Sequence, residues 1–222
     1  MKSVVLLSSG LDSSVNLYEA HQAGSVLLAL TFNYGQKAVK KEIEKSKALC
    51  EKLKIPHEVL DLSFFKSFQG SSLINQSLHI PGQKEVQIDD LSASQKTAKS
   101  VWVPNRNGIF LNIAAGFAEN LKADVVVPGF NIEEASTFAD NSEEFLNSLD
   151  KSFSFSTNNA VKTKCFTTRL NKTQIVKRAI ELKVPLYDLW PCYHDDESWC
   201  GQCESCQRAK RAFEANGLNF IK

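Results

Sequence analysis

Seven residues near the amino terminus, Ser8-Ser9-Gly10-Leu11-Asp12-Ser13-Ser14, place hydroxyl groups, a glycine and a carboxylate in one turn. Backbone N–H groups and serine hydroxyls in such a turn can donate to a phosphate, and a helix that starts there adds partial positive charge. The turn lacks the Gly-Lys-Ser/Thr ending of a Walker A sequence, so it carries no lysine to clamp phosphates. Asp12 suits an anion site if a magnesium ion bridges its carboxylate and the phosphates. The alternative is that Asp12 and Ser13 only cap the helix.

A second group of residues with chemical potential is a cysteine cluster near the carboxyl terminus, spaced C-x7-C-x2-C-x2-C. Its members are Cys192, Cys200, Cys203 and Cys206. Four thiolates can hold Zn²⁺ in a tetrahedron or a 4Fe–4S cluster, and the spacing favours zinc. Zinc with four thiolates has no open position, which predicts a structural role. Gly201 frees the backbone for the tight turn, and we expect His194 beside the metal rather than bound to it.

The two other cysteines, Cys50 and Cys165, have no partner at a metal-binding spacing. Isolated cysteines in helices and strands usually fill a hydrophobic core, although a catalytic thiol of a sulfur-transfer enzyme would look the same. Arg106 is a candidate for binding a phosphate or carboxylate, because a planar guanidinium suits both anions. Its alternative role is a surface or structural ion pair.

Apolar runs alternate with helical patterns and predict the elements that position these residues. The predicted strands are Val4–Leu7, Val26–Phe32, Glu58–Leu62, Asp124–Val127 and Val161–Thr168. The predicted helices are Leu11–Ala20, Lys37–Lys54, Asn107–Lys122, Ser142–Phe155, a helix from Asn171 to about Lys183, and Glu204–Ala215. Asn141 with Glu144 and Asn171 with Gln174 look like helix caps. Strands that are apolar throughout and separated by helices indicate a parallel sheet covered on both faces, a Rossmann-like α/β fold.

The chain divides into an α/β domain over residues 1–185 and a small zinc-binding helical appendage over residues 186–222. Residues 63–100 are rich in Ser, Gln, Lys and Asn and predict an irregular insertion that could act as a lid. The helix over residues 37–54 carries many lysines interrupted by Glu42, Glu44 and Glu51, a pattern typical of a solvated face.

Composition limits the classes of function. The chain has 222 residues, 43% of them hydrophobic, and its 26 Lys and Arg nearly balance its 25 Asp and Glu. A net charge of +1 provides no overall field to attract nucleic acid or a membrane. The first apolar run is too short for a signal peptide or a spanning helix, so we expect a cytoplasmic protein with reduced cysteines.

Several segments resemble a known family. Ser8-Ser9-Gly10-Leu11-Asp12-Ser13 resembles the Ser-Gly-Gly-X-Asp-Ser loop of the PP-loop ATP pyrophosphatase superfamily. The loop and the four-cysteine motif together resemble the 7-cyano-7-deazaguanine (preQ0) synthase family. This resemblance spans nearly the whole chain. The other matching segments are Val103-Pro104-Asn105-Arg106-Asn107, Gly129-Phe130-Asn131 with Asp140 and Glu144-Phe145, Pro185-Leu186, and Trp190-Pro191-Cys192-Tyr193.

The chain departs from the family pattern at two places. Residues 139–145 lack a Cys-Arg pair, so another group must do the work of that arginine if it contacts substrate. Ser9 replaces a glycine, which requires that its backbone φ stay negative.

The resemblance implies an ATP-dependent ligase that converts 7-carboxy-7-deazaguanine and ammonia to 7-cyano-7-deazaguanine for queuosine biosynthesis. It implies ATP, Mg²⁺ and Zn²⁺ as cofactors and small molecules as partners, with no nucleic acid or membrane, and we expect a homodimer. The residues expected at the nucleotide are Leu7, Ser8, Ser9, Gly10, Leu11, Asp12, Ser13 and Ser14, and those expected in catalysis are Asp12, Ser13 and Arg106.

Two other functions remain open. A PP-loop enzyme that thiolates tRNA would use Cys50, Cys165 or an iron–sulfur cluster. A zinc-ribbon module that binds nucleic acid without catalysis would leave the loop at residues 8–14 unexplained.

Overall fold

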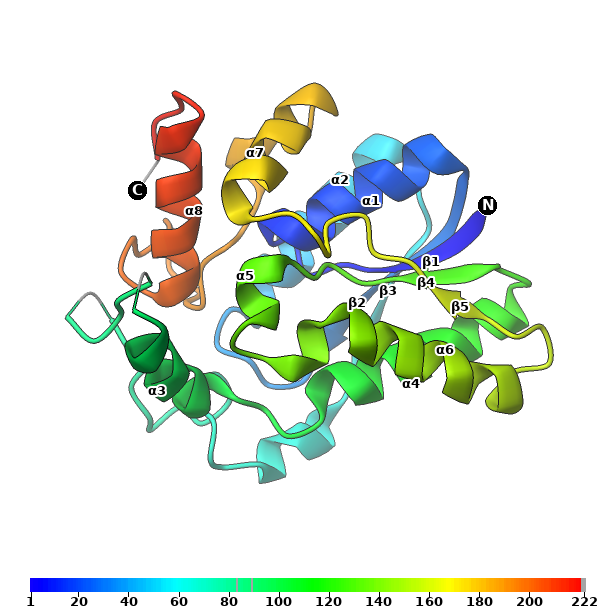
Figure 1. Ribbon diagram of the computed structural model, residues 1–222, viewed down its shortest axis with the longest axis horizontal. Coiled ribbons are helices and arrows are strands. Elements are labelled where there is room, and N and C mark those ends of the chain that lie inside the picture. The colour runs from blue at the N-terminus through cyan, green and yellow to red at the C-terminus, as the bar shows by residue number, and fades with distance from the viewer. Residues whose placement is uncertain (83, 89, 221–222) are drawn as a thin grey trace.

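A parallel sheet with helices on both faces forms the centre of the computed structural model, which describes residues 1–82, 84–88 and 90–220 (Figure 1). Residues 83 and 89 of the expected insertion and 221–222 of the expected appendage lie outside the described residues. The strands are β1 (Lys2–Leu6), β2 (Ser25–Asn33), β3 (His57–Asp61), β4 (Val125–Val127) and β5 (Lys162–Thr163). The helices are α1 (Leu11–Ala23), α2 (Val39–Leu53), α3 (Leu91–Val101), α4 (Arg106–Asn120), α5 (Ile132–Ala135), α6 (Glu143–Ser156), α7 (Lys172–Glu181) and α8 (Glu204–Ala215).

The strand order is β3-β2-β1-β4-β5, and every pair is parallel. Helices α1, α2 and α7 cover one face of the sheet, and α4 and α6 cover the other (Figure 1). The chain runs outward from β1 through β2 and β3, then returns to place β4 on the other side of β1. The loops after β1 and β4 therefore flank a crevice at the carboxyl ends of the strands, where such sheets bind ligands. The predicted fold class is confirmed.

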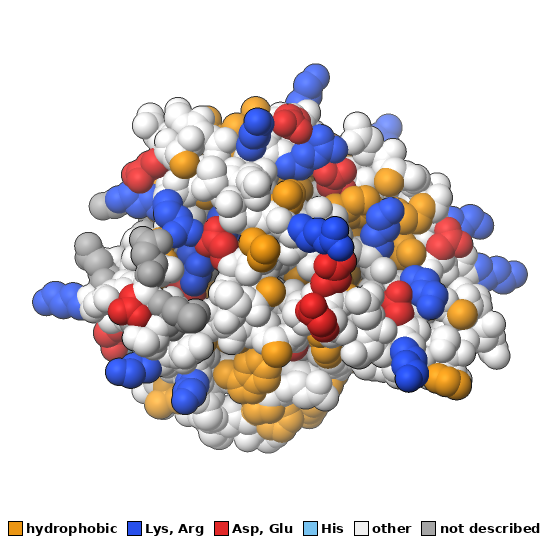
Figure 2. Space-filling view, viewed as in Figure 1, with side chains coloured by type: hydrophobic (Ala, Val, Ile, Leu, Met, Phe, Trp, Pro, Cys, Tyr) orange, Lys and Arg blue, Asp and Glu red, His pale blue; other side chains and the backbone are white. Residues whose placement is uncertain are grey.

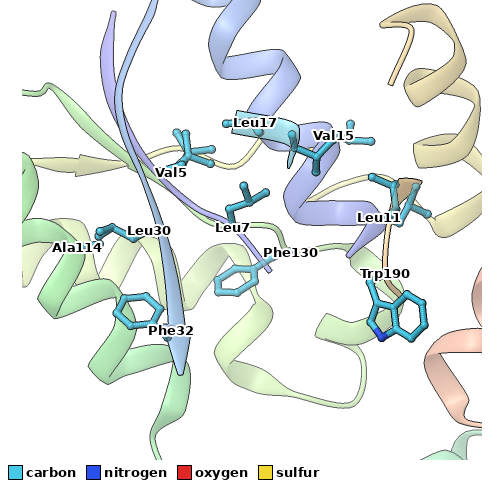
Figure 3. Close-up of a cluster of buried hydrophobic side chains, with 14 of the residues drawn as sticks. Val5, Leu7, Leu11, Val15, Leu17, Leu30, Phe32, Ala114, Phe130 and Trp190 are labelled. Carbon is cyan, nitrogen blue, oxygen red and sulfur yellow. The ribbon is translucent and has the colours of Figure 1, made fainter. Parts of the chain in front are cut away.

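The hydrophobic core extends to this ligand-binding edge. Val5 and Val15 are buried between the sheet and α1, whereas Leu30 lies on the other face beside Ala114 of α4. Figure 3 shows Phe130 and Trp190, from two loops far apart in sequence, near Leu7 and Leu11 at this edge. Helix α1 is buried along its first eight residues, polar ones included. A helix start enclosed in this way must have its N–H groups and polar side chains satisfied by protein or by a ligand.

Two expected elements differ from the structure. The insertion over residues 63–100 is not wholly irregular, because it contains a 3₁₀ turn over Ser63–Ser67 and most of α3. The last expected strand ends after Thr163, since Phe166 N donates to Asn16 Oδ1 and the Thr167 hydroxyl donates to Phe130 O, which draw the chain away from the sheet.

Smaller differences concern helix ends. The cap of α6 is Ser142, whose side chain accepts from Phe145 N, rather than Asn141. The capping box of Asn171 and Gln174 and the bounds of α8 are confirmed.

Candidate active site

The loop between β1 and α1 has a backbone conformation that differs from expectation. Ser9 lies in the left-handed region, with φ of 57°, whereas Gly10 is extended, with φ of −65° and ψ of 166°. The expectation that Ser9 keeps a negative φ was therefore wrong. A left-handed serine costs about 1–2 kcal/mol, and its hydroxyl donates to Ser8 O over 2.6 Å.

Ser13 ties the loop together. Its hydroxyl accepts from Ser8 N at 3.2 Å and lies 3.2 Å from both the Ser8 hydroxyl and Gly10 O. Hydrogen bonds within the loop therefore fix its conformation before any ligand binds. The backbone N–H groups that these bonds do not use keep a fixed direction.

The loop after β4 presses against the start of α1 at Gly129. A Cβ atom at this position would lie 2.5 Å from Ser13 N and 2.6 Å from Ser13 Cα. No side chain fits such a gap, so glycine here permits the two loops to meet. Asn16 also holds the start of α1 in place, because its amide donates to Asp12 O at 2.9 Å and to Thr167 Oγ1 at 2.6 Å.

Three charged side chains form a cluster at the loop, in which Asp12 and Lys172 are buried and Glu134 is partly exposed. The Lys172 ammonium, at the first position of α7, pairs with Asp12 and, at 2.8 Å, with Glu134 of α5. Burial raises the pKa of Asp12 to about 6 although Lys172 opposes this, while Lys172 holds the pKa of Glu134 below its ordinary value. The lysine absent from the loop sequence is thus supplied by α7.

The Asp12–Lys172–Glu134 cluster is suited to a further cation. Two carboxylates share one ammonium, and Asp12 Oδ1 is buried without a hydrogen-bond partner in the described part of the chain. A divalent cation at that oxygen would compensate the remaining negative charge and could bind phosphate oxygens. The donor set therefore fits Mg²⁺.

A cavity of about 250 Å³ opens in front of the loop. Of the residues expected at the nucleotide, Leu7, Ser8, Gly10, Leu11, Asp12 and Ser13 line it, whereas Ser9 and Ser14 are not among the described lining residues. The opposite wall carries aromatic rings, with Phe32 stacked on Phe110 at 4.2 Å between centroids.

Arg106 lies in the aromatic part of the cavity. Its guanidinium sits 5.7 Å from the centre of the Tyr34 ring and donates to the Tyr34 hydroxyl at 3.4 Å. Neighbouring charge from Tyr34 and Asp140 raises the pKa of Arg106 in spite of burial. Arg106 makes no ion pair within the described part of the chain, so its charge is available to an anion in the cavity.

The four cysteines expected to bind metal come together. Their sulfur atoms lie within 4.8 Å of one another, and Cys200 Sγ is 3.9 Å from Cys206 Sγ. The sulfur–sulfur edge of a tetrahedral zinc–thiolate site is about 3.8 Å for a zinc–sulfur bond of about 2.3 Å. Gly201, with φ of 67°, makes the expected turn.

Backbone groups surround the sulfur cluster. Cys200 Sγ accepts from the N–H groups of Gln202 and Cys203, at 3.4 and 3.3 Å. His194 contributes its backbone, whose N–H donates to Cys192 Sγ at 3.4 Å and whose carbonyl accepts from Trp190 Nε1. These donors favour thiolates, the form that binds metal.

The cysteine segment also forms part of the cavity. Trp190 N donates to Ser9 O at 2.9 Å, and Trp190, Cys192 and Tyr193 line the cavity. Arg208 of α8 pairs with Glu204 at 2.8 Å and with Glu133 of α5 at 2.9 Å. Residues 186–220, called the metal segment below, therefore contact both the nucleotide loop and α5.

The remaining cysteines lie away from the cavity lining. Cys50 is buried in α2, and burial raises the pKa of its thiol to about 12. Cys165 contacts the backbone of Phe130 on both its N–H and its carbonyl. Neither arrangement provides the exposed thiolate that sulfur transfer needs.

Sequence reasoning missed Lys172, Glu134, Tyr34 and Glu42. The capping box at Asn171 fixes Lys172 at the first position of α7, yet nothing local indicates that this end of α7 faces the loop. Glu42 was assigned to a solvated helix face, whereas the structure places it in the cavity lining.

A parallel sheet with this loop at its switch point defines a nucleotide-binding protein of the PP-loop type. The family model described as "Queuosine biosynthesis protein QueC" matches residues 2–217, and the chain belongs to this family. A 7-cyano-7-deazaguanine synthase of Bdellovibrio bacteriovorus is 55% identical over 219 residues, covering 98% of this chain and 95% of the relative. One of Methanosarcina mazei is 44% identical, with coverage of 98% and 96%.

Solved structures support the fold. An NMN synthetase from Francisella tularensis superposes with a TM-score of 0.50 at 16% identity, covering 99% of this chain and 78% of that one. A 4-thiouridine synthetase in an RNA complex with bound ATP gives a TM-score of 0.51 at 18% identity, with coverage of 96% and 50%. Within residues 1–82, 84–88 and 90–220, no helix has the length and apolar character needed to cross a membrane.

Proposed function

We propose that this chain converts 7-carboxy-7-deazaguanine, ATP and ammonia to 7-cyano-7-deazaguanine. The observation that carries the proposal is one cavity lined on one side by the loop of residues 8–13 and on the other by Phe32, Phe110 and Arg106. The first wall suits the phosphates of ATP, and the second suits a flat aromatic acid. The names of the relatives supply the substrate class.

The reaction needs both oxygen atoms of the carboxylate to leave, one in each of two activations. ATP first converts a carboxylate oxygen into a leaving group, and ammonia displaces it to form an amide. A second activation then removes the amide oxygen as the carbon–nitrogen triple bond forms. The protein would hold phosphates and acid in line and keep water from the activated carbonyl.

Individual residues take the following roles in the proposal. Ser8, Ser13 and the backbone of Gly10 and Leu11 bind phosphate, and Lys172 orients Asp12. Asp12 Oδ1 would hold Mg²⁺, which supplies charge neutralisation on the phosphates. The Arg106 guanidinium, which lies beside the Tyr34 ring, would bind the substrate carboxylate.

The metal at Cys192, Cys200, Cys203 and Cys206 is proposed to be zinc in a structural role. The near-tetrahedral sulfur spacing supports zinc, and four thiolates leave no site for substrate. We retain the division into residues 1–185 and 186–222, the homodimer and the cytoplasmic location as parts of this proposal.

Sulfur transfer to tRNA is the alternative with the closest fold. The high pKa of Cys50 disfavours this alternative, and neither Cys50 nor Cys165 is among the described residues that line the cavity. On the face shown in Figure 2, basic side chains are interspersed with acidic ones, unlike the continuous basic surface that an RNA backbone favours.

Mass spectrometry of the products tests the proposal. Purified protein with ATP, ammonium and 7-carboxy-7-deazaguanine should form the amide and then the nitrile, and omission of ATP should abolish both. ATP turnover that depends on RNA, or none with the acid, would contradict it.

A further inference from the structure

Glu42 is a carboxylate held at the cavity by a fixed amide. It lies in the first turn of α2 and accepts from Gln36 Nε2 at 2.8 Å. Gln36 is itself only 3% exposed, and it donates to Phe32 O and accepts from Tyr34 N. Both functional ends of Gln36 are therefore fixed, and Glu42 Oε2 is fixed with them.

Glu42 differs in its partner from three other carboxylates of the cavity, whereas Asp140 likewise accepts from a neutral amide, that of Asn141, at 3.1 Å. Asp12 and Glu134 pair with Lys172, and Glu204 pairs with Arg208. Glu42 makes no ion pair within the described part of the chain, and its side chain accepts a hydrogen bond from a neutral amide. A small cation in the cavity would therefore meet an uncompensated carboxylate beside the aromatic rings of Tyr34 and Phe32, whose faces also attract cations.

The charges that face Glu42 come from several elements. Arg106 of α4 lowers the pKa of Glu42, Asp195 of the metal segment raises it, and the hydroxyl of Tyr34 faces the same space. Burial outweighs the hydrogen bond from Gln36 and the charge of Arg106, and raises the pKa to about 7. A base that titrates near neutrality can both accept and return a proton.

The nitrogen substrate makes such a base necessary. At neutral pH ammonia exists almost wholly as ammonium, which has no lone pair and cannot attack a carbonyl. We propose that Glu42 binds ammonium in the cavity and accepts its proton, so that ammonia is released beside the activated carboxylate. The inference rests on the proposed function and assigns the site of its nitrogen substrate.

The proton balance is as follows. Ammonium gives one proton to the Glu42 carboxylate, and the lone pair of the resulting ammonia forms the C–N bond at the carbonyl carbon. The bond from that carbon to the activated oxygen then breaks, and its electron pair leaves with the phosphate-bearing group. The nitrogen loses a further proton to solvent as the neutral amide forms, and Glu42 returns its own proton to solvent before the next ammonium binds.

The test compares two nucleophiles in wild-type protein and in Glu42→Gln, at saturating ATP and deazaguanine acid. With ammonium near neutral pH, kcat/KM should fall by about 100-fold, the usual contribution of a positioned base. It should recover as pH rises, in proportion to free ammonia. With hydroxylamine, which is already neutral, formation of the hydroxamate should stay within about threefold of wild type.

Two controls separate this role from others. Glu44→Gln changes an exposed carboxylate on the same helix and should leave both rates unchanged. ATP affinity of Glu42→Gln, measured by calorimetry, should equal that of wild type.

An equal loss with both nucleophiles, or a loss that does not recover at high pH, would overturn the inference. The inference would also be overturned if Asp140→Asn, which alters the carboxylate facing Arg106, and not Glu42→Gln, lost activity with ammonium alone and recovered it at high pH. Wild-type protein that makes no nitrile would instead contradict the proposed function.

Discussion

At the residue scale, the Asp12–Lys172–Glu134 cluster sets the charge of the site. Burying an ion pair costs solvation of both groups, and the cost is recovered only if the partners remain in place. Lys172 is 4% exposed and serves two carboxylates at once. The cluster is therefore sensitive to loss of its single cation.

Lys172→Met should destabilise the protein by about 3–5 kcal/mol near pH 8, because the buried Asp12 and the partly buried Glu134 lose their counterion. Burial already raises the pKa of Asp12 beside Lys172, and without the lysine it would raise the pKa of Asp12 further and that of Glu134 above its value in the unfolded chain. The stability that they contribute is then present at low pH and lost as pH rises. The cost should accordingly be much smaller near pH 5, which urea unfolding at both values would measure.

The exposed Lys177 on the same helix provides the control for this change. Lys177→Met should shift the free energy of unfolding by less than about 0.5 kcal/mol at either pH. A cost for Lys172→Met that is the same at both values would show that packing of the side chain, rather than its charge, stabilises the cluster.

Asp12→Asn should abolish nitrile formation, because an amide oxygen is a poor ligand for a hard divalent cation. Loss of the charged hydrogen bond to Lys172 should also cost about 2 kcal/mol of stability. Ser13→Ala removes one hydroxyl and should weaken ATP binding by about 1–2 kcal/mol. Product analysis and calorimetry measure these effects, and wild-type turnover in Asp12→Asn would reduce Asp12 to a helix-capping role.

The loop residues of the site could be predicted from sequence, but its charge cluster could not. Asp12, Ser13 and the four cysteines occur in local patterns whose chemistry is readable. Lys172 lies 160 positions from Asp12, and only the packing of α7 on α1 joins them. Ser9 was misjudged because its left-handed backbone is stabilised by contacts such as Trp190 N to Ser9 O, which no local rule contains.

At the scale of elements, parallel strands with helices on both faces could be anticipated, whereas α3 could not. Among the α3 side chains that the structure describes, the buried ones are Ser94, Thr97, Ala98 and Val101, which follow helical spacing with little apolar character. The hydroxyl of Thr97 donates to Ser94 O at 3.1 Å and is satisfied within the helix. Two of these four buried residues carry hydroxyl groups, so reading the sequence for large apolar side chains at helical spacing overlooks α3.

The contact between the β4 loop and α1 leads to a prediction about loop spacing. Gly129→Ala would bring Cβ to 2.5 Å from Ser13 N, so the two loops must separate. We expect a loss of about 1–3 kcal/mol in stability, as for overpacking elsewhere, and weaker ATP binding. Thermal unfolding and calorimetry measure the two effects.

Gly116 in α4 is the matched control, since an added Cβ there meets no atom within 4 Å. Gly116→Ala should stabilise the helix by about 0.5–1 kcal/mol and leave ATP binding unchanged. If Gly129→Ala binds ATP as tightly as wild type, the close contact of the loops does not shape the nucleotide site.

At the scale of the whole molecule, the segment that carries the four cysteines closes the ligand-binding edge of the sheet. The expectation that this segment has few apolar residues of its own is wrong, because Trp199 packs on Phe213 and Phe220. A metal held by the four cysteines would add its binding energy to this packing. Elemental analysis should find about one zinc per chain and no iron. Cys203→Ser should lose the metal and become sensitive to protease, whereas Cys50→Ala, which alters a buried core thiol, should retain it. Stoichiometric iron with labile sulfide would contradict zinc and favour the sulfur-transfer alternative.

The hydrogen bond from Trp190 N to Ser9 O joins the segment that carries the four cysteines to the nucleotide loop. We therefore expect metal binding and nucleotide binding to affect each other. If zinc orders the segment that holds Ser9 in its left-handed conformation, zinc tightens ATP binding, and ATP must tighten zinc binding by the same factor. A chelator should then remove zinc more slowly when ATP is present. In a cell short of zinc, a supply of ATP would thus help to keep the protein loaded with metal.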